Sequence, residues 1–196
     1  DLADGSRLAH VEVGAFPHGI TLTPGKAWVA NALDGTVSVI DAESYAVIDT
    51  IRAVRIPLPP ALARGKRLFH SSDDPRLARA GWISCASCHF EGEHDGRTWR
   101  FAFAGPRNTT SLRGMVQSYP LRWSAEWDES ADSELAVTEE QFGTGLLGGD
   151  MHPPLGTPNT GRSYDLDCLA AYLDSLETPP NRVATTLDPG AVERGQ

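Results

Sequence analysis

Residues 85–89 read Cys85-Ala86-Ser87-Cys88-His89, and this pentapeptide carries the clearest chemistry in the chain. Two thiols separated by two residues fit on one helical turn, and the imidazole follows the second thiol directly. This spacing is the attachment signature of c-type haem, in which both cysteines bind the porphyrin and the histidine ligates the iron. We therefore predict one covalent haem c held by Cys85 and Cys88, with His89 as the proximal iron ligand.

The same pentapeptide has two other interpretations, a zinc half-site and a redox-active cysteine pair. Zinc needs further Cys or His ligands at suitable spacing. The chain has 3 cysteines, and the third, Cys168, stands alone in an apolar stretch. A thioredoxin-like pair needs a βαβ context, which the surrounding sequence lacks. We therefore favour covalent haem.

The second axial ligand of the iron decides whether the predicted haem transfers electrons or binds a small molecule. The chain has 2 methionines. Met151 lies beside two prolines that stiffen its loop, shortly before the last predicted helix. That place resembles the position of the methionine ligand in class I cytochromes c, so we favour Met151. Met115, His152, His94 and an open coordination position are the alternatives.

Two predicted helices must position the haem motif. The first runs from about Ala61 to Phe69, and Gly65 and Phe69 share one of its faces. The second covers residues 164–176, and leucines at helical spacing form its buried stripe, Leu166, Leu169, Leu173 and Leu176. We expect Tyr172 to pack against Gly65 and Phe69. The predicted fold class is a mainly α class I cytochrome c domain preceded by an all-β propeller blade fragment.

The N-terminal region predicts β-structure. Short apolar runs separated by turn signals occur at His10–Val13, Gly19–Leu22, Ala27–Ala30, Val37–Ile40 and Ala46–Ile51. Residues 1–14 align on residues 41–54, and a period of about 40 residues is typical of a propeller blade. Residues 28–31 (WVAN) resemble the motif that names the YVTN-type propeller repeat. Because one blade cannot bury its own faces, we expect the end of a longer, truncated propeller. A plain β-meander is the alternative.

Three segments follow the haem motif, Gly96–Trp99 (GRTW), Arg107–Gly114 (RNTTSLRG) and Tyr119–Trp123 (YPLRW). They resemble the di-haem cytochrome c peroxidase and MauG group, in particular its members fused behind YVTN-type propellers. Arg122 stands where that group carries a histidine, which weakens the case for peroxidase chemistry at this haem. The resemblance also implies a second haem domain, and residues 190–196 repeat the beginning of the first predicted helix as such a domain would.

Four further side chains are candidates for contact with the haem. Arg107 and Arg113 offer forked donors that match the haem propionates, with an ordinary surface position as the alternative. Trp99 and Trp123 would pack on the porphyrin or line a route to a second haem, with an ordinary core position as the alternative. Seven acidic residues between Glu126 and Glu140 predict a solvated helix or loop, and a calcium site is the weaker alternative.

The chain divides into four predicted parts. Residues 1–56 form the terminal part of a YVTN-like β-propeller, residues 57–60 a proline-rich linker, residues 61–180 a c-type cytochrome domain, and residues 181–196 a linker and the start of a second, missing haem domain.

Composition narrows the function. The chain has 196 residues, 17 basic and 26 acidic, and a net charge of −9, which disfavours nucleic acid as a partner. No apolar run reaches the length of a membrane span. Because covalent haem is attached outside the bacterial cytoplasm, we expect a periplasmic or extracellular protein whose signal peptide is not in this chain.

Together these features predict a c-type cytochrome that transfers electrons through one haem to a redox partner protein or a second haem domain. The alternative is a haem peroxidase or MauG-like oxidase with an open distal site. A third interpretation makes the propeller a docking module and the haem domain a passive relay or sensor.

Overall fold

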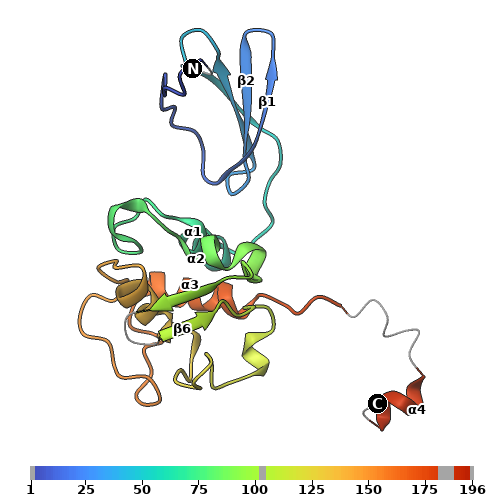
Figure 1. Cartoon of the computed structure of the whole chain (residues 1–196), viewed down its shortest axis with the longest axis vertical. Helices are drawn as coiled ribbons and strands as arrows, with labels where there is room; N and C mark the ends of the chain where they lie inside the picture. Colours follow the sequence, from blue (N-terminus) through green and yellow to red (C-terminus); the bar gives the residue numbers. More distant parts are fainter. Residues whose placement is uncertain (1–2, 102–104, 181–187, 195–196) are drawn as a thin grey trace.

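The computed structural model describes residues 3–101, 105–180 and 188–194, and it contains a β-sheet unit followed by a helical unit (Figure 1). The sheet consists of four antiparallel strands in sequence order, β1 (Pro17–Thr23), β2 (Lys26–Asn31), β3 (Thr36–Asp41) and β4 (Val47–Arg52). The strand expected at His10–Val13 is absent, because this segment pairs with no neighbour in the described chain. The other four expected strands are confirmed.

The turn residues explain why this sheet is a simple meander. Gly25, which has a φ of +71°, closes the tight hairpin between β1 and β2, where Thr23 pairs with Lys26. Gly35 has a φ of +64° in the next turn. Because glycine adopts this left-handed conformation without steric penalty, β2 and β3 each reverse onto the strand before them.

The two longest helices, α1 (Pro60–His70) and α3 (Tyr164–Asp174), pack against each other. A Cβ on Gly65 would collide with the backbone carbonyl of Cys168, so only glycine permits this close crossing. The rings of Phe69 and Tyr172 meet edge to face with centroids 5.3 Å apart. The expected contact of Tyr172 with the Gly65/Phe69 corner is thus confirmed.

Short elements connect α1 to α3. They are η1 (Arg79–Gly81), α2 (Cys85–Cys88), η2 (Phe90–Gly92), β5 (Thr98–Phe101), β6 (Gly105–Asn108), η3 (Met115–Gln117), η4 (Ser130–Ser133) and the π-helical turn η5 (Ala136–Glu140). A further short helix, α4 (Pro189–Glu193), lies near the C-terminus. No helix in the described part of the chain combines the length and the apolar character that crossing a bilayer requires.

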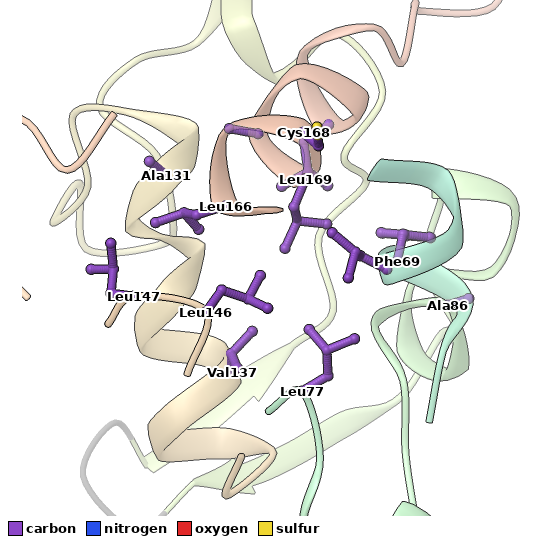
Figure 2. Packing of buried hydrophobic residues seen from close by; sticks show 13 residues of the cluster. Phe69, Leu77, Ala86, Ala131, Val137, Leu146, Leu147, Leu166, Cys168 and Leu169 are labelled. Carbon is purple, nitrogen blue, oxygen red and sulfur yellow. The ribbon is translucent and has the colours of Figure 1, made fainter. Parts of the chain in front are cut away.

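The hydrophobic core of the helical unit gathers between α1, α3 and the segment around η5 (Figure 2). Its fully buried side chains include Phe69, Leu77, Val137, Leu166 and Leu169. Burial of such side chains from water is the main favourable term in folding. The leucine stripe predicted for the last helix therefore does supply core residues.

The predicted fold class is wrong in one respect, because the chain is not mainly α. About 28% of it is helical and 20% is strand, so the architecture is mixed. The four-stranded sheet and the β5–β6 hairpin supply the strands. Between α2 and α3 the chain runs mostly through loops and single turns, which reduces the helical share.

The acidic stretch from Glu126 to Glu140 is less solvated than its composition predicted. Asp132 is 1% exposed and Glu134 is 3% exposed. The Glu134 carboxylate accepts hydrogen bonds from the backbone amides of Leu146 (3.0 Å) and Leu147 (2.8 Å). Buried carboxylates need such donors, so part of this stretch organises the loop that precedes α3.

Among the described residues, an ion pair and an aromatic contact join the sheet to the helical unit. Asp34, in the turn before β3, pairs with Arg67 on α1. Phe16, just before β1, meets His70 edge to face with ring centroids 4.5 Å apart. Of the predicted C-terminal part, residues 181–187 and 195–196 lie outside the described residues.

Candidate haem site

A cavity of about 430 Å³ in the helical unit is lined by all three residues of the predicted haem motif, Cys85, Cys88 and His89. Apolar side chains from both long helices, among them Phe69 and Leu169, form part of its wall. Cavities of several hundred Å³ with mostly apolar walls are typical of cofactor sites.

Helix α2 places the two thiols on one turn. The helix begins after Ser84, whose backbone amide donates to the Ser87 hydroxyl at 3.1 Å, and such a contact stabilises a helix start. The backbone amide of His89 donates to the Cys85 carbonyl at 2.9 Å and ends the turn. The local sequence therefore brings both sulfurs and the imidazole to one wall of the cavity.

The ring of His89 is held in one orientation. Its Nδ1–H donates to the carbonyl of Thr110 at 2.9 Å, and the carbonyl of Glu93 lies 3.3 Å away. Burial lowers the pKa of His89, although these two carbonyls act in the opposite direction. A neutral imidazole with a protonated Nδ1 keeps the Nε2 lone pair free, which is the form that ligates a metal.

The two thiols are protonated at neutral pH. Burial raises the pKa of Cys85. Burial, together with the nearby carboxylate of Asp95, raises the pKa of Cys88 to about 11. Redox-active cysteine pairs instead have lowered pKa values, because the thiolate is the nucleophile. The structure therefore disfavours the interpretation of this motif as a redox-active pair.

Gln141 adds a polar group to the cavity wall that its sequence position did not predict. The side chain is 7% exposed, and its Nε2 donates to the Sγ of Cys85 at 3.5 Å. Its Oε1 is buried without a hydrogen-bond partner. An unpartnered buried oxygen is costly. This atom, the apolar walls and the free Nε2 of His89 fit a large planar cofactor with polar edges, so the residues present fit haem.

Four of the 5 tryptophans in the chain line the cavity, Trp82, Trp99, Trp123 and Trp127. Trp99 and Trp123 were predicted here, and their indole N–H groups donate to Asp95 and to the Asn108 carbonyl, both at 2.8 Å. Trp82 and Trp127 were missed because isolated aromatic residues carry no positional signal in sequence.

The two arginines predicted to bind the haem propionates, Arg107 and Arg113, occupy different places in the structure. Arg107 lines the cavity and donates to the Ser124 hydroxyl at 3.2 Å. Arg113 is absent from the cavity lining. It pairs with Glu93 at 3.1 Å and donates to the Glu91 carbonyl at 2.7 Å. Its guanidinium is therefore already engaged by neighbouring acceptors.

Arg122 is a cavity residue that the propionate argument did not select. It pairs with Glu140, which also lines the cavity, and with Glu126 at 3.3 Å. Its guanidinium lies 4.5 Å from the centroid of the Trp127 ring, within cation–π range. Its φ of +70° is uncommon for a residue with a side chain, and such strain concentrates at functional sites. One sequence feature could have identified Arg122 as a site residue: it stands where the MauG group carries a histidine.

Only one of the side chains considered for the second axial position lines the cavity. Met115 does so together with His89. Met151 packs against the edge of the hydrophobic core and is absent from the cavity lining, as are His94 and His152. The Nδ1 of His152 lies 3.1 Å from the Pro158 carbonyl.

Two known proteins are similar to parts of this chain. The chain is 34% identical over 86 residues to the methylamine utilization protein MauG of Methylorubrum extorquens, covering 41% of this chain. It is 25% identical over 101 residues to the small ribosomal subunit protein RACK1 of Medicago sativa, a WD-repeat propeller, covering 50% of this chain.

The chain spans 24% of the length of this MauG and 31% of the length of this RACK1. No family model matches the chain, and no solved structure matches it. The partial similarity to MauG hints at a haem-related cytochrome function.

Proposed function

We propose that this chain is the haem-binding part of a c-type cytochrome that transfers electrons. One observation carries the proposal: a C-x-x-C-H turn lines a largely apolar cavity, and the Nδ1–H of His89 is bound to a backbone carbonyl. This arrangement leaves Nε2 as the ligating nitrogen and both thiols beside it. Haem c would be bound through Cys85, Cys88 and His89, and it would supply a reversible one-electron iron couple.

The chain's own residues would bind, orient and shield this cofactor. Thr110 fixes the imidazole through its carbonyl. The buried side chains of the wall, Trp127, Leu121, Leu169 and Leu173, exclude water, and a drier site changes the potential of a haem. Arg107 supplies positive charge on the wall, which suits a carboxylate of a porphyrin, whereas Arg122 is already paired with Glu140 and Glu126.

Met115 would be the second protein ligand of the iron, because among the methionines and histidines considered it is the one that lines the same cavity as His89. Met151, which the sequence argument favoured, lies against the core beside that cavity. A methionine ligand would raise the potential of the iron, which suits electron transfer.

The sheet would be one blade of a β-propeller that docks beside the cytochrome. The similarity to a WD-repeat protein supports this proposal. All residues of β1 and β4 are exposed, and Ile20 and Leu22 are 68% and 74% exposed. Apolar strands of this kind are stabilised by neighbouring blades. We also propose a periplasmic or extracellular location, and a redox partner protein or a second haem domain as the electron partner.

A peroxidase or MauG-like oxidase is the second candidate function. The carboxylate of Glu140 favours it, because it lines the cavity and is a group that can exchange a proton with a small ligand, whereas Arg122 in place of the histidine of the MauG group counts against it. Catalysis would need an open iron position and a group able to transfer protons.

Expression with a c-type cytochrome maturation system tests the proposal. We expect haem to stay on the chain after denaturation, and the double variant Cys85→Ser/Cys88→Ser to lose it. Cys168→Ala is the matched control and keeps the haem, because this thiol lies on α3 and not at the cavity. A chain that never acquires covalent haem would refute the proposal, and rapid binding of carbon monoxide by the reduced protein would favour the oxidase.

A further inference from the structure

The carboxylate of Asp95 is the centre of a small hydrogen-bond network beside the haem motif. It accepts from the backbone amide of Arg97 at 3.0 Å, from the Trp99 indole N–H at 2.8 Å and from the Thr109 hydroxyl at 2.8 Å. Three donors on one carboxylate fix its position strongly, because hydrogen bonds to an ionised acceptor are the stronger ones. Burial works against the charged form, but these bonds outweigh it and lower the pKa of Asp95.

The Asp95 network includes Thr109, the residue next to the one whose carbonyl orients His89. Thr109 precedes Thr110, whose carbonyl accepts the Nδ1–H of His89 at 2.9 Å. The backbone amide of Thr109 donates to the Arg97 carbonyl at 3.3 Å, so the same segment is bound from two sides. The β5–β6 hairpin, in which Trp99 pairs with Arg107, joins both sides of the network.

We propose that Asp95 is a positioning residue for His89. By holding the hydroxyl of Thr109 it fixes the carbonyl of Thr110, and this carbonyl holds the imidazole through Nδ1–H. A firm bond at Nδ1 makes the opposite nitrogen a more basic ligand and stabilises the oxidised iron. This inference rests on the proposed haem attachment, and it assigns a role to a residue that lies outside the C-x-x-C-H motif.

Two simpler roles for Asp95 must be separated from positioning. Its negative charge would itself stabilise oxidised iron at short range. It could also hold the hairpin together without affecting the histidine. Thr109→Val separates these roles, because it removes the hydroxyl that links Asp95 to the Thr110 segment and keeps the charge.

The experiment uses the haem-loaded chain as wild type, Thr109→Val, Asp95→Asn and the control Asp49→Asn. Asp49 is exposed on β4, and its replacement makes the same change in charge. Two properties are measured, the reduction potential and the hydrogen-exchange rate of the His89 Nδ1 proton in the paramagnetic NMR spectrum. We expect Thr109→Val to raise the potential and to speed the exchange about fivefold to tenfold, as for the loss of one hydrogen bond.

Asp95→Asn should change both properties in the same direction, and Asp49→Asn should leave both at the wild-type values. If Thr109→Val binds haem but leaves both properties unchanged, Asp95 does not position His89 and the inference is refuted. If Asp95→Asn raises the potential while proton exchange keeps its wild-type rate, charge alone is responsible and the inference is again refuted. A wild-type chain without covalent haem refutes the proposed function instead, and the two failures are therefore distinguishable.

Discussion

At the scale of single residues, one environment keeps the three groups of the haem motif neutral. Burial raises the pKa of both thiols, Cys85 and Cys88, and lowers that of the imidazole of His89. Neutral imidazole is the form that binds iron. Protonated thiols form disulfides slowly, because the thiolate is the attacking species. In the proposed haem site, the same burial would therefore prepare the ligand and protect the attachment points.

The axial ligand gives a prediction at this scale. Replacement of Met115 by leucine should abolish the weak red-edge absorption band of methionine-ligated ferric haem and lower the reduction potential. The matched variant Met151→Leu should keep both properties. Absorption spectra and redox titration of the two haem-loaded variants provide the measurement. Loss of the band in Met151→Leu alone would show that the sequence argument had selected the correct methionine.

The haem motif could be predicted from sequence because its chemistry is local. Cys85, Cys88 and His89 occupy one turn, so their relation does not depend on the rest of the fold. Arg113 and Met151 depend on the path of the long connection between α2 and α3. That path is set by tertiary contacts, such as those of the buried Glu134 carboxylate, which residue spacing does not encode.

At the scale of elements, the crossing of α1 and α3 depends on a single glycine. The Gly65→Ala variant places a methyl group against the Cys168 carbonyl, and overpacking of this kind costs about 3 kcal/mol. We expect a correspondingly lower free energy of unfolding in urea titrations. Gly148→Ala is the control, because a Cβ there meets no atom within 4 Å. Equal stability of the two variants would show that the helices can separate at no cost.

A second prediction concerns the ion pairs of Asp165 on α3 with Arg64 on α1 and with Arg76 in the segment after α1. Asp165 on α3 accepts from Arg64 at 2.8 and 2.7 Å and pairs with Arg76 at 2.9 Å. The hydrogen bond from Arg64 is the main cause of the lowered pKa of Asp165, against the effect of burial. We expect Asp165→Asn to cost about 1–2 kcal/mol at pH 7, because both arginines remain partly hydrated.

The stability lost in Asp165→Asn should depend on pH, because folding lowers the pKa of Asp165. A carboxylate whose pKa is lowered by folding stabilises the native state above its unfolded pKa, near 3.8, and less as pH falls through the native value. The difference between wild type and Asp165→Asn should therefore shrink below pH 3.8 in urea titrations. A difference that stays constant from pH 7 to pH 2 would show that the charge of Asp165 contributes nothing. Asp49→Asn controls for the loss of one carboxylate.

The elements themselves differed in how well sequence predicted them. Apolar alternation located four strands, and helical spacing located α1 and α3 within a residue or two at each end. The segment His10–Val13 has the pattern of a strand but no partner among the described residues, and a strand needs one. The prediction of a mainly α fold gave the chain too large a helical share. The connection between α2 and α3 contains few regular helical turns.

At the scale of the whole molecule, one face of α1 joins the sheet to the helical unit. Arg67 pairs with Asp34, and His70 packs on Phe16. Burial lowers the pKa of His70, so its ring stays neutral and fits against an apolar neighbour. The connection between the units, residues 53–59, has no helix or strand. The orientation of the sheet therefore depends on these side-chain contacts.

We expect the double variant Arg67→Ala/His70→Ala to loosen this junction while both units stay folded. The connecting residues 53–59 should then be cleaved faster by a protease of broad specificity, because removal of the contacts frees the two units to move. Lys26→Ala, which removes a positive charge on β2 and away from α1, is the control. Cleavage at the wild-type rate in the double variant would show that other contacts hold the sheet.

The position of Phe69 has a consequence for the way such proteins recombine during evolution. Phe69 lines the cavity, while Arg67, two residues before it, and His70, directly after it, contact the sheet unit. A single helix thus serves two neighbours that are often treated as exchangeable modules. A chimera that replaces the sheet alone would leave Arg67 and His70 facing a foreign surface. A chimera that exchanges the sheet unit must therefore also replace the α1 residues that contact the sheet. Because Phe69 lies between these residues and lines the cavity, such a replacement can disturb the cavity wall.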